Sequence, residues 1–242
     1  EKIDHFSPVL KLDENPYEQV IAIFHSSGST SFPKLVPFSN RFLLNAVEST
    51  HTHHTHEIIL STPPLFHIYG FFHALKYILS PGSTYAFPIV AGSIPLANEV
   101  LHSLKQSKAT ILYILPAILE QIYTNYPDEI KTLVNLKAIY YGGAALVHQV
   151  GEQLVQSGVK IRNSYGATEI GHFMMTPENL SPNIPWNAMK LIVPESDIIW
   201  IERNDILDGA KELVIKKNSS ILANIKDNGD YRVGDLFIEA KK

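Results

Sequence analysis

An α/β fold, in which helices cover a largely parallel sheet, is the class that this sequence of 242 residues predicts. Short apolar runs with strand character alternate with amphipathic segments of helical length along most of the chain. This alternation favours parallel strands, because each return to the same edge of a sheet needs a crossover that a helix can supply. After residue 197 the strands are separated by turns alone, which predicts a small antiparallel β-subdomain. We therefore expect an irregular lead-in over 1–19, the α/β region over 20–190 and the β-subdomain over 191–242.

Each predicted element follows from a local pattern. The unbroken apolar run Val20–Phe24 predicts a buried strand, Pro116 separates a strand from the helix after it, and apolar side chains share one side of the helix 40–50. The predicted strands of the α/β region, in chain order, are 20–24, 57–61, 83–87, 110–115, 136–141 and 159–163. The predicted helices are 40–50, 71–79, 94–107, 117–126 and 149–157. The predicted strands of the β-subdomain are 198–202, 212–216 and 231–239.

The composition excludes several classes of protein. The chain is 45% apolar, which is enough for a packed core, and its net charge of -4 offers no basic surface for nucleic acid or an anionic membrane. No apolar stretch approaches the roughly 20 residues of a membrane-spanning helix. Without cysteine the chain has no disulfide framework or thiolate metal site, which suits a reducing compartment. We expect a cytoplasmic protein and, because the chain begins at Glu1 without an initiator methionine, a piece of a longer one.

The segment from His25 to Lys34 has the composition of a phosphate-binding loop. It reads His-Ser-Ser-Gly-Ser-Thr-Ser-Phe-Pro-Lys and directly follows the first predicted strand. Hydroxyl groups and free backbone N–H groups can surround phosphate oxygens there, and Lys34 can add a positive charge. A solvated turn with a surface lysine is the alternative that this segment alone leaves open.

Two further segments come at the ends of predicted strands, where the ligands of open α/β sheets bind. They are 142–146 and 164–169. Gly142 and Gly143 would let the backbone approach a flat base, because they have no Cβ. Tyr165 offers a ring for stacking, Thr168 a hydroxyl for phosphate, and Glu169 a carboxylate oxygen for Mg²⁺.

Asp235, near the end of the chain, could accept hydrogen bonds from both hydroxyls of a ribose. Taken singly, each of these residues also has a purely structural interpretation. Tyr165 could be a core residue, Glu169 a solvated cap and Asp235 a turn residue.

Five segments in the correct order resemble the adenylate-forming superfamily, which includes acyl- and aryl-CoA ligases, luciferases and nonribosomal-peptide adenylation domains. The segments are 25–34, Pro63-Pro64-Leu65-Phe66-His67-Ile68-Tyr69-Gly70, Tyr141-Gly142-Gly143-Ala144-Ala145-Leu146, Asn163-Ser164-Tyr165-Gly166-Ala167-Thr168-Glu169 and Tyr231-Arg232-Val233-Gly234-Asp235-Leu236. The resemblance implies that ATP and a carboxylic acid form acyl-AMP and pyrophosphate, with Mg²⁺ as cofactor. It also implies transfer of the acyl group to a phosphopantetheine thiol on a downstream carrier domain.

The resemblance assigns roles to individual residues of this sequence. Those implied to be catalytic are Lys34, His67, Thr168 and Glu169, with Glu169 also holding Mg²⁺. Those implied to bind the nucleotide are His25, Ser26, Ser27, Gly28, Ser29, Thr30, Gly142, Gly143, Ala144, Asn163, Ser164, Tyr165, Gly166 and Asp235. His67 is implied to line the carboxylate pocket and to orient the acid near the α-phosphate; a satisfied core histidine is the alternative.

Two positions depart from the pattern of the superfamily. Ser31 stands where the phosphate loop usually has glycine, which restricts the backbone, and Val233 stands where the ribose segment usually has threonine, which removes a hydroxyl. Lys34, Glu169 and Asp235 are retained, so we still predict a working site.

His25 and the segment 185–190 are similar to fungal nonribosomal-peptide-synthetase-like enzymes, in which a reductase domain often follows the carrier domain. A free-standing CoA ligase and a non-catalytic nucleotide-binding module remain alternatives. The acid is expected to be aromatic or otherwise bulky and apolar, because of Phe66-His67-Ile68-Tyr69. A plain NTPase is least favoured, because the Gly-x4-Gly-Lys-Ser/Thr loop is absent.

Two features, a metal site and a C-terminal lid, are expected to be absent from this chain. The histidines at 51, 53, 54 and 56 lie among threonines, and a solvated loop is favoured over a metal site. The resemblance ends at Leu236, so the small C-terminal lid of the superfamily, with its lysine, is expected to be absent from this chain.

Overall fold

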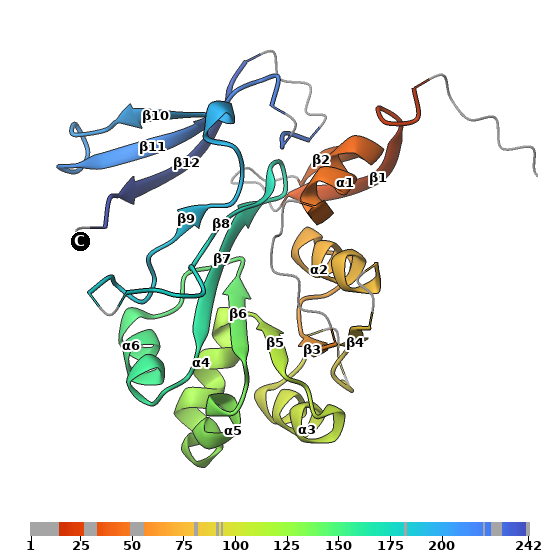
Figure 1. Ribbon diagram of the computed structural model, residues 1–242, viewed down its shortest axis with the longest axis vertical. Coiled ribbons are helices and arrows are strands. Elements are labelled where there is room, and N and C mark those ends of the chain that lie inside the picture. Colours follow the sequence, from red (N-terminus) through yellow and green to blue (C-terminus); the bar gives the residue numbers. More distant parts are fainter. Residues whose placement is uncertain are drawn as a thin grey trace, which may run out of the picture.

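A sheet of seven strands forms the centre of the part of the chain that the structure, a computed structural model, describes (Figure 1). The described residues are 15–26, 33–48, 56–79, 82–90, 92, 94–181, 183–219, 221–223 and 229–240. The strand order is β4-β3-β5-β6-β7-β8-β9. The strands are β3 (Ile58–Ser61), β4 (Thr84–Ala86), β5 (Ile111–Ile114), β6 (Ala138–Gly142), β7 (Ile161–Ala167), β8 (Gly171–Met175) and β9 (Lys190–Leu191). The first five in this order are parallel, as predicted, whereas β8 and β9 add an antiparallel edge that was not predicted.

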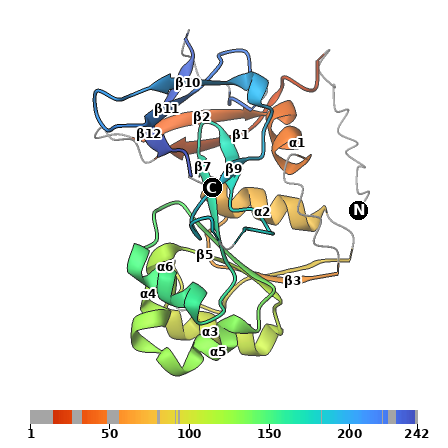
Figure 2. The ribbon, with the colours of Figure 1, turned by 60° about the vertical axis from the view of Figure 1, so that its left-hand side comes forward.

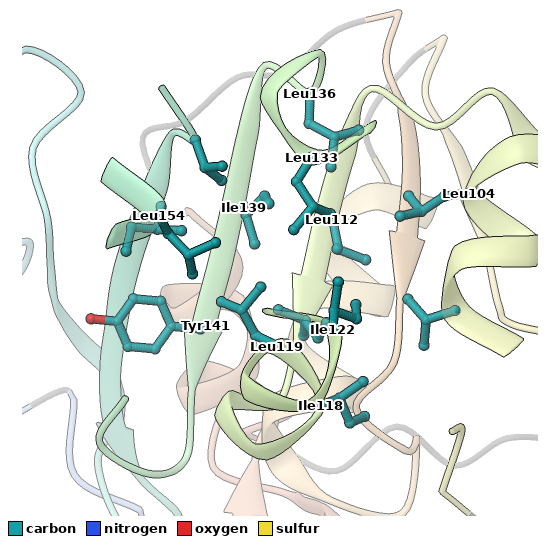
Figure 3. Packing of buried hydrophobic residues seen from close by; sticks show 14 of the residues in the cluster. Leu104, Leu112, Ile118, Leu119, Ile122, Leu133, Leu136, Ile139, Tyr141 and Leu154 are labelled. Atoms are coloured by element: carbon teal, nitrogen blue, oxygen red, sulfur yellow. The ribbon is translucent and has the colours of Figure 1, made fainter. Parts of the chain in front are cut away.

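Helices cover both faces of this sheet. They are α2 (Ile68–Ile78), α3 (Ala97–Ser107), α4 (Pro116–Asn125), α5 (Ile130–Val134) and α6 (His148–Gln156). Figure 3 shows side chains of α4, α5 and α6 pointing at Leu112, Ile139 and Tyr141 on one face of the sheet. On the other face, Tyr77 of α2 packs with Tyr113 and Tyr140. The helix α5 was not predicted, and the 3-10 turns Pro127–Glu129 and Glu195–Asp197 complete the helical segments.

Local chemistry explains where two helices begin. The helix α2 begins at Ile68, three residues earlier than predicted, because the Nδ1 atom of His67 accepts a hydrogen bond from the backbone N–H of Tyr69 at 3.2 Å. The helix α4 begins at Pro116, whose missing N–H costs no hydrogen bond in the first turn. The side-chain cap thus fixes the N-terminus of α2.

The first predicted strand forms a separate hairpin, which corrects two expectations. The strand β1 (Val20–Ser26) pairs antiparallel with β2 (Lys34–Ser39), and α1 (Asn40–Glu48) follows. The apolar run 20–24 is not buried: Ile21 is 51% exposed and Ile23 62% exposed. A two-stranded hairpin covered on one side buries one face only, and here Phe38 of β2 packs against Phe42 of α1, with ring centroids 4.7 Å apart. The segment 25–34 therefore joins two antiparallel strands, whereas we expected it at the end of a strand in the parallel sheet.

The predicted β-subdomain is present as a three-stranded antiparallel sheet, made of β10 (Ile198–Glu202), β11 (Ala210–Ile215) and β12 (Tyr231–Ile238). Figure 2 shows this sheet and the β1–β2 hairpin at the same end of the molecule. Buried Glu212 accepts hydrogen bonds from Arg203 at 2.8 Å and from Arg232 at 2.9 and 2.6 Å. No described helix is both long and apolar enough to cross a membrane.

Candidate functional site

A cavity of about 260 Å³ lies where the hairpin, the start of α2, the end of β6 and the β7–β8 connection meet. Its lining residues are Ser26, His67, Ile68, Tyr69, Phe72, His73, Gly143, Ser164, Gly166, Ala167, Thr168, Glu169, Gly171 and His172. The lining combines hydroxyls, one carboxylate, three imidazoles and two aromatic rings. Segments that are far apart in the sequence thus form one wall, as predicted, although only Gly143 directly follows a strand of the parallel sheet in the way we expected.

The structure brings many of the predicted site residues to this cavity and places others around it. Those that line it are Ser26, His67, Gly143, Ser164, Gly166, Thr168 and Glu169. Those in the same segments that do not line it are His25, Lys34, Gly142, Ala144, Asn163, Tyr165 and Asp235. Ser27, Gly28, Ser29, Thr30 and Ser31 lie outside the described residues.

The register of β6 and β7 fixes the backbone at the cavity. Gly142 pairs with Ser164, and a Cβ added at Gly142 would lie 2.3 Å from the Ser164 carbonyl oxygen. Gly142 is therefore required by strand packing, which differs from the predicted contact with a base. Gly143 has φ +82° and nothing within 4 Å of an added Cβ, so open space lies beside its backbone. Of the two glycines, Gly143 can be approached by a ligand.

The segment 164–169 also differs from the prediction. We expected a strand to end at Asn163, but β7 continues to Ala167 and pairs with β8. Thr168 and Glu169 lie in the tight turn between these strands, where Thr168 is buried and the Glu169 carbonyl oxygen accepts a hydrogen bond from Ala223 N–H at 2.8 Å. The β7–β8 turn thus holds a hydroxyl and a carboxylate at the cavity.

His67 lies at the N-terminus of α2 and is exposed, so it is not the core histidine of the alternative interpretation. Its Nδ1 atom is the acceptor of the Tyr69 N–H, which leaves the proton on Nε2. Partial burial, followed by the charge of His25, lowers the pKa of His67. A neutral imidazole that donates through Nε2, beside the positive end of a helix dipole, suits a carboxylate or phosphate ligand.

Lys34 and Ser26 face each other across the hairpin. They are paired residues of β1 and β2, at the end where the chain passes through 27–32. Lys34 is exposed at this position. The hairpin therefore places a lysine at the base of the predicted phosphate loop, next to the Ser26 edge of the cavity.

Tyr165 and Asp235 connect the main sheet to the small sheet. The Tyr165 hydroxyl donates a hydrogen bond to Asp235, and the Tyr165 ring packs edge-on against Phe173 and Phe237, with centroids 5.0 and 5.5 Å away. Burial, and then the hydrogen bond to Asp235, raise the pKa of Tyr165. The residue predicted to stack on a base is thus adjacent to the residue predicted to bind a ribose.

Sequence reasoning missed three polar residues near the cavity. His73 and Lys76 lie on α2 and are 3% and 6% exposed, and His172 lies on β8. The available signal was the presence of His73 and Lys76 within an otherwise apolar helix. Only the packing of α2 against β8 brings His73 within 6.0 Å of His172, measured between ring centroids.

The histidine cluster is largely outside the described residues, which include His56 but not the histidines at 51, 53 and 54. Within the ranges that the structure covers, no group of three or more His, Cys, Asp or Glu side chains could hold a metal ion.

This chain is similar to known AMP-binding and adenylate-forming proteins. The family model described as "AMP-binding enzyme" matches residues 4–197. The non-ribosomal peptide synthetase ascB of Acremonium egyptiacum is 38% identical over 189 residues, which are 75% of this chain and 17% of that protein. The adenylate-forming reductase stbB of Stachybotrys bisbyi is 33% identical over 186 residues, again 75% of this chain and 17% of that protein. Other relatives are named as CoA ligases.

Among solved structures, ATP-bound MatB from Rhodopseudomonas palustris superposes with a TM-score of 0.71 at 16% identity, over 93% of this chain and 46% of that chain. The chain therefore spans less than half of these proteins, and the structural match supports the predicted fold. Because the family model covers most of the chain and two relatives exceed 30% identity over three quarters of it, the chain belongs to the AMP-binding enzyme family, whose members are adenylate-forming enzymes.

Proposed function

We propose that this chain binds ATP and an aryl or otherwise bulky, apolar carboxylic acid, and that it supports their conversion to acyl-AMP and pyrophosphate. One observation carries the proposal: Ser26, His67, Gly143, Thr168 and Glu169 come from separate segments and line one cavity. Hydroxyls, a neutral imidazole and a carboxylate at one opening suit a phosphate that meets a carboxylic acid. The aromatic rings of Tyr69 and Phe72 on the same wall suit a flat, apolar acid.

In the proposed reaction, a carboxylate oxygen of the acid attacks the α-phosphorus of ATP in line. The P–O bond to the β-phosphate breaks, and pyrophosphate leaves with that bridging oxygen. Catalysis then depends on positioning and on neutralising phosphate charge. Mg²⁺, when bound, neutralises charge on the phosphate oxygens.

Each polar residue at the cavity would contact a different part of the reacting groups. His67, with its proton on Nε2, donates to the acid or the α-phosphate, and the N-terminus of α2 favours the same negative charge. The Thr168 hydroxyl contacts phosphate, and Lys34 at the loop end of the hairpin neutralises the phosphate charge. Glu169 supplies one oxygen to Mg²⁺, which usually takes one or two carboxylates together with phosphates and water.

The nucleoside would lie toward the small sheet. Gly143 leaves open space beside its backbone, and Tyr165 and Asp235 lie together where a base and a ribose would follow. We assign stacking on the base to Tyr165 and the ribose hydroxyls to Asp235. Ser164 and Gly166, which precede and follow Tyr165 in β7, also line the cavity.

Calorimetry with AMP tests the nucleotide assignment. Asp235→Ala removes a charged hydrogen-bonding partner of the ribose, so AMP binding should weaken by about tenfold or more. Asp208→Ala is the matched control, because Asp208 is an exposed residue in the turn before β11. Equal AMP affinity of Asp235→Ala and the unchanged protein would show that the ribose assignment is wrong.

For the acyl acceptor we propose a carrier-domain thiol in the full-length protein, followed by reduction. The names of the relatives, a non-ribosomal peptide synthetase and adenylate-forming reductases, favour this choice. Transfer to free CoA is the second candidate, which the relatives named as CoA ligases favour. Acyl transfer by the full-length protein, measured with CoA and with a phosphopantetheine-bearing carrier domain side by side, separates the two.

A further inference from the structure

The strand β12 carries a bulge at 233–235, which includes the proposed ribose ligand Asp235. The register with β11 is regular on both sides of the bulge, but it shifts between Glu212 and Val214 of β11. A single residue of β11, Leu213, therefore stands opposite the three residues of the bulge. Extra residues bend a strand, and bulges beside binding sites redirect side chains. The bulge thus sets the direction of Asp235.

Gly234, at the centre of the bulge, has φ +87°, a conformation that residues with a side chain rarely adopt. Next to it, Asp235 points toward the main sheet, where its Oδ2 atom accepts a hydrogen bond from the Tyr165 hydroxyl. Asp235 is exposed, so a ligand can reach it. The position of its carboxylate therefore depends on whether the bulge keeps its shape.

A bidentate ion pair spans the bulge. Arg232, which precedes the bulge, donates from Nε to Oε1 of Glu212 at 2.9 Å and from Nη2 to Oε2 of Glu212 at 2.6 Å. Glu212 lies on β11 opposite Leu236, which follows the bulge. Two parallel hydrogen bonds between an arginine and a carboxylate fix geometry as well as charge. The ion pair therefore connects the two ends of the bulge across the small sheet.

Glu212 is a firm anchor for this connection. It is only 5% exposed, and its Oε2 atom accepts a further hydrogen bond from Arg203, which follows β10, at 2.8 Å. A buried carboxylate has few alternative positions, because movement away from its donors would leave a charge without compensation. Of the two arginines, only Arg232 belongs to the strand that carries the bulge.

We infer that Glu212 and Arg232 are positioning residues of the nucleotide site: their ion pair holds the bulge of β12 in the shape that presents Asp235 to the two ribose hydroxyls. The inference rests on the proposed function, in which Asp235 binds the ribose, and adds residues that do not touch the ligand. Both act through the backbone of β12.

Calorimetry with AMP and 2′,3′-dideoxy-AMP measures what the ribose hydroxyls contribute to binding. The two probes carry the same base and the same phosphate charge, so the ratio of their affinities isolates the contact with Asp235. In the unchanged protein, AMP should bind about tenfold or more tightly than the dideoxy compound. Asp235→Ala should bring this ratio to about one.

Arg232→Met removes the guanidinium and keeps an unbranched side chain. We expect the affinity ratio to fall to about threefold or less, because Asp235 is no longer held toward the ribose. Arg232→Lys retains the charge but not the two parallel hydrogen bonds, so it should keep part of the ratio. In the Asp235→Ala background, Arg232→Met should not change the ratio further, since the residue through which it acts is gone.

Arg203→Met is the matched control. It removes a guanidinium from the same carboxylate and the same charge from the small sheet, but Arg203 lies outside β12. It should lower stability toward urea and leave the affinity ratio unchanged. An equal fall of the ratio in Arg203→Met and Arg232→Met would trace the effect to general stability and overturn the inference. If Arg232→Met does not fold, as judged by circular dichroism, Arg232→Lys and Glu212→Gln decide, because they preserve side-chain size.

The outcomes separate the two levels of the proposal. If the unchanged protein binds neither AMP nor the dideoxy compound, or binds both equally, the nucleotide or ribose assignment is wrong and this inference is wrong with it. If AMP is preferred but the Arg232 and Glu212 variants keep the full preference, the ribose assignment stands and the positioning role is overturned.

Discussion

The hydroxyl of Tyr165 donates a hydrogen bond to the carboxylate of Asp235 and so links β7 of the main sheet to β12 of the small sheet. In the proposed site the same carboxylate accepts hydrogen bonds from the ribose. Tyr165 bonds to the Oδ2 atom alone, but two ribose hydroxyls that each donate to one carboxylate oxygen would need both oxygens. We therefore predict that AMP displaces the Tyr165 hydroxyl from Asp235.

Tyr165→Phe tests this competition, because it keeps the ring between Phe173 and Phe237 and removes only the hydroxyl. We expect AMP to bind roughly fivefold more tightly, since a hydrogen bond of about 1 kcal/mol no longer has to be broken. Calorimetry measures the change, with Tyr123→Phe on α4 as the control. Weaker binding by Tyr165→Phe would show instead that the hydroxyl supports the nucleotide site.

Gly142→Ala is expected to destabilise the fold. An added Cβ would lie 2.3 Å from the Ser164 carbonyl oxygen and 3.2 Å from the Tyr69 ring, and the first of these atoms belongs to the backbone of a central strand. Relief of the overlap requires β6 and β7 to separate, at a cost of about 1–3 kcal/mol. Urea denaturation measures the loss. Gly92→Ala is the control, because nothing lies within 4 Å of its added Cβ, and equal stability of the two variants would contradict the packing argument.

The stability of the small sheet should depend on pH through Glu212. Hydrogen bonds from Arg232, the largest cause, and then from Arg203 lower the pKa of Glu212 to about 2, from its ordinary value of 4.5. A folded-state pKa below the unfolded value adds stability that is fully present above about pH 4.5 and is lost as the pH falls toward about 2. Denaturant unfolding between pH 7 and pH 2 should show this loss.

Glu212→Gln should flatten that pH dependence, because the amide does not titrate. Glu202→Gln serves as the control, since Glu202 lies on the neighbouring strand with an exposed side chain 3.5 Å from Lys211. If the free energy of unfolding of Glu212→Gln fell with pH as steeply as that of the unchanged protein, Glu212 would not be the cause of the loss of stability in acid.

Elements whose signal is local could be predicted from the sequence. The strands β5 and β6 and the helix α4 have unbroken or periodic apolar patterns, and Pro116 marks the boundary between β5 and α4. Each of these elements lies within a few residues of its prediction. The strand β1 has the same apolar pattern but is exposed, because burial depends on whether a second layer covers both faces. The strand β8 was missed, because His172 interrupts its apolar pattern and its pairing with β7 follows a tight turn.

The candidate site likewise contains residues that the sequence predicted and residues that it did not. The placement of three segments directly after predicted strands led us to expect that the residues around Ser26, Gly143 and Thr168 would meet, and all three residues line the cavity. His73 and His172 are 99 positions apart in the numbering and belong to no predicted motif. Their proximity comes from the packing of a helix on an antiparallel edge strand that the sequence pattern does not reveal.

Glu169→Gln is expected to remove the magnesium-dependent part of ATP binding. The amide keeps the shape of the side chain but lacks the charge that favours Mg²⁺, so ATP affinity should lose most of its response to magnesium, while AMP, which needs less metal, should bind as before. Calorimetry with ATP and AMP across a magnesium series measures both, with exposed Glu178→Gln as the control. Tyr231 gives a second readout, because burial and then the charge of Glu169 raise its pKa, and Glu169→Gln should lower that pKa in a spectroscopic titration. A lowered Tyr231 pKa together with an unchanged magnesium response would place Glu169 beside Tyr231 but exclude it as the magnesium ligand.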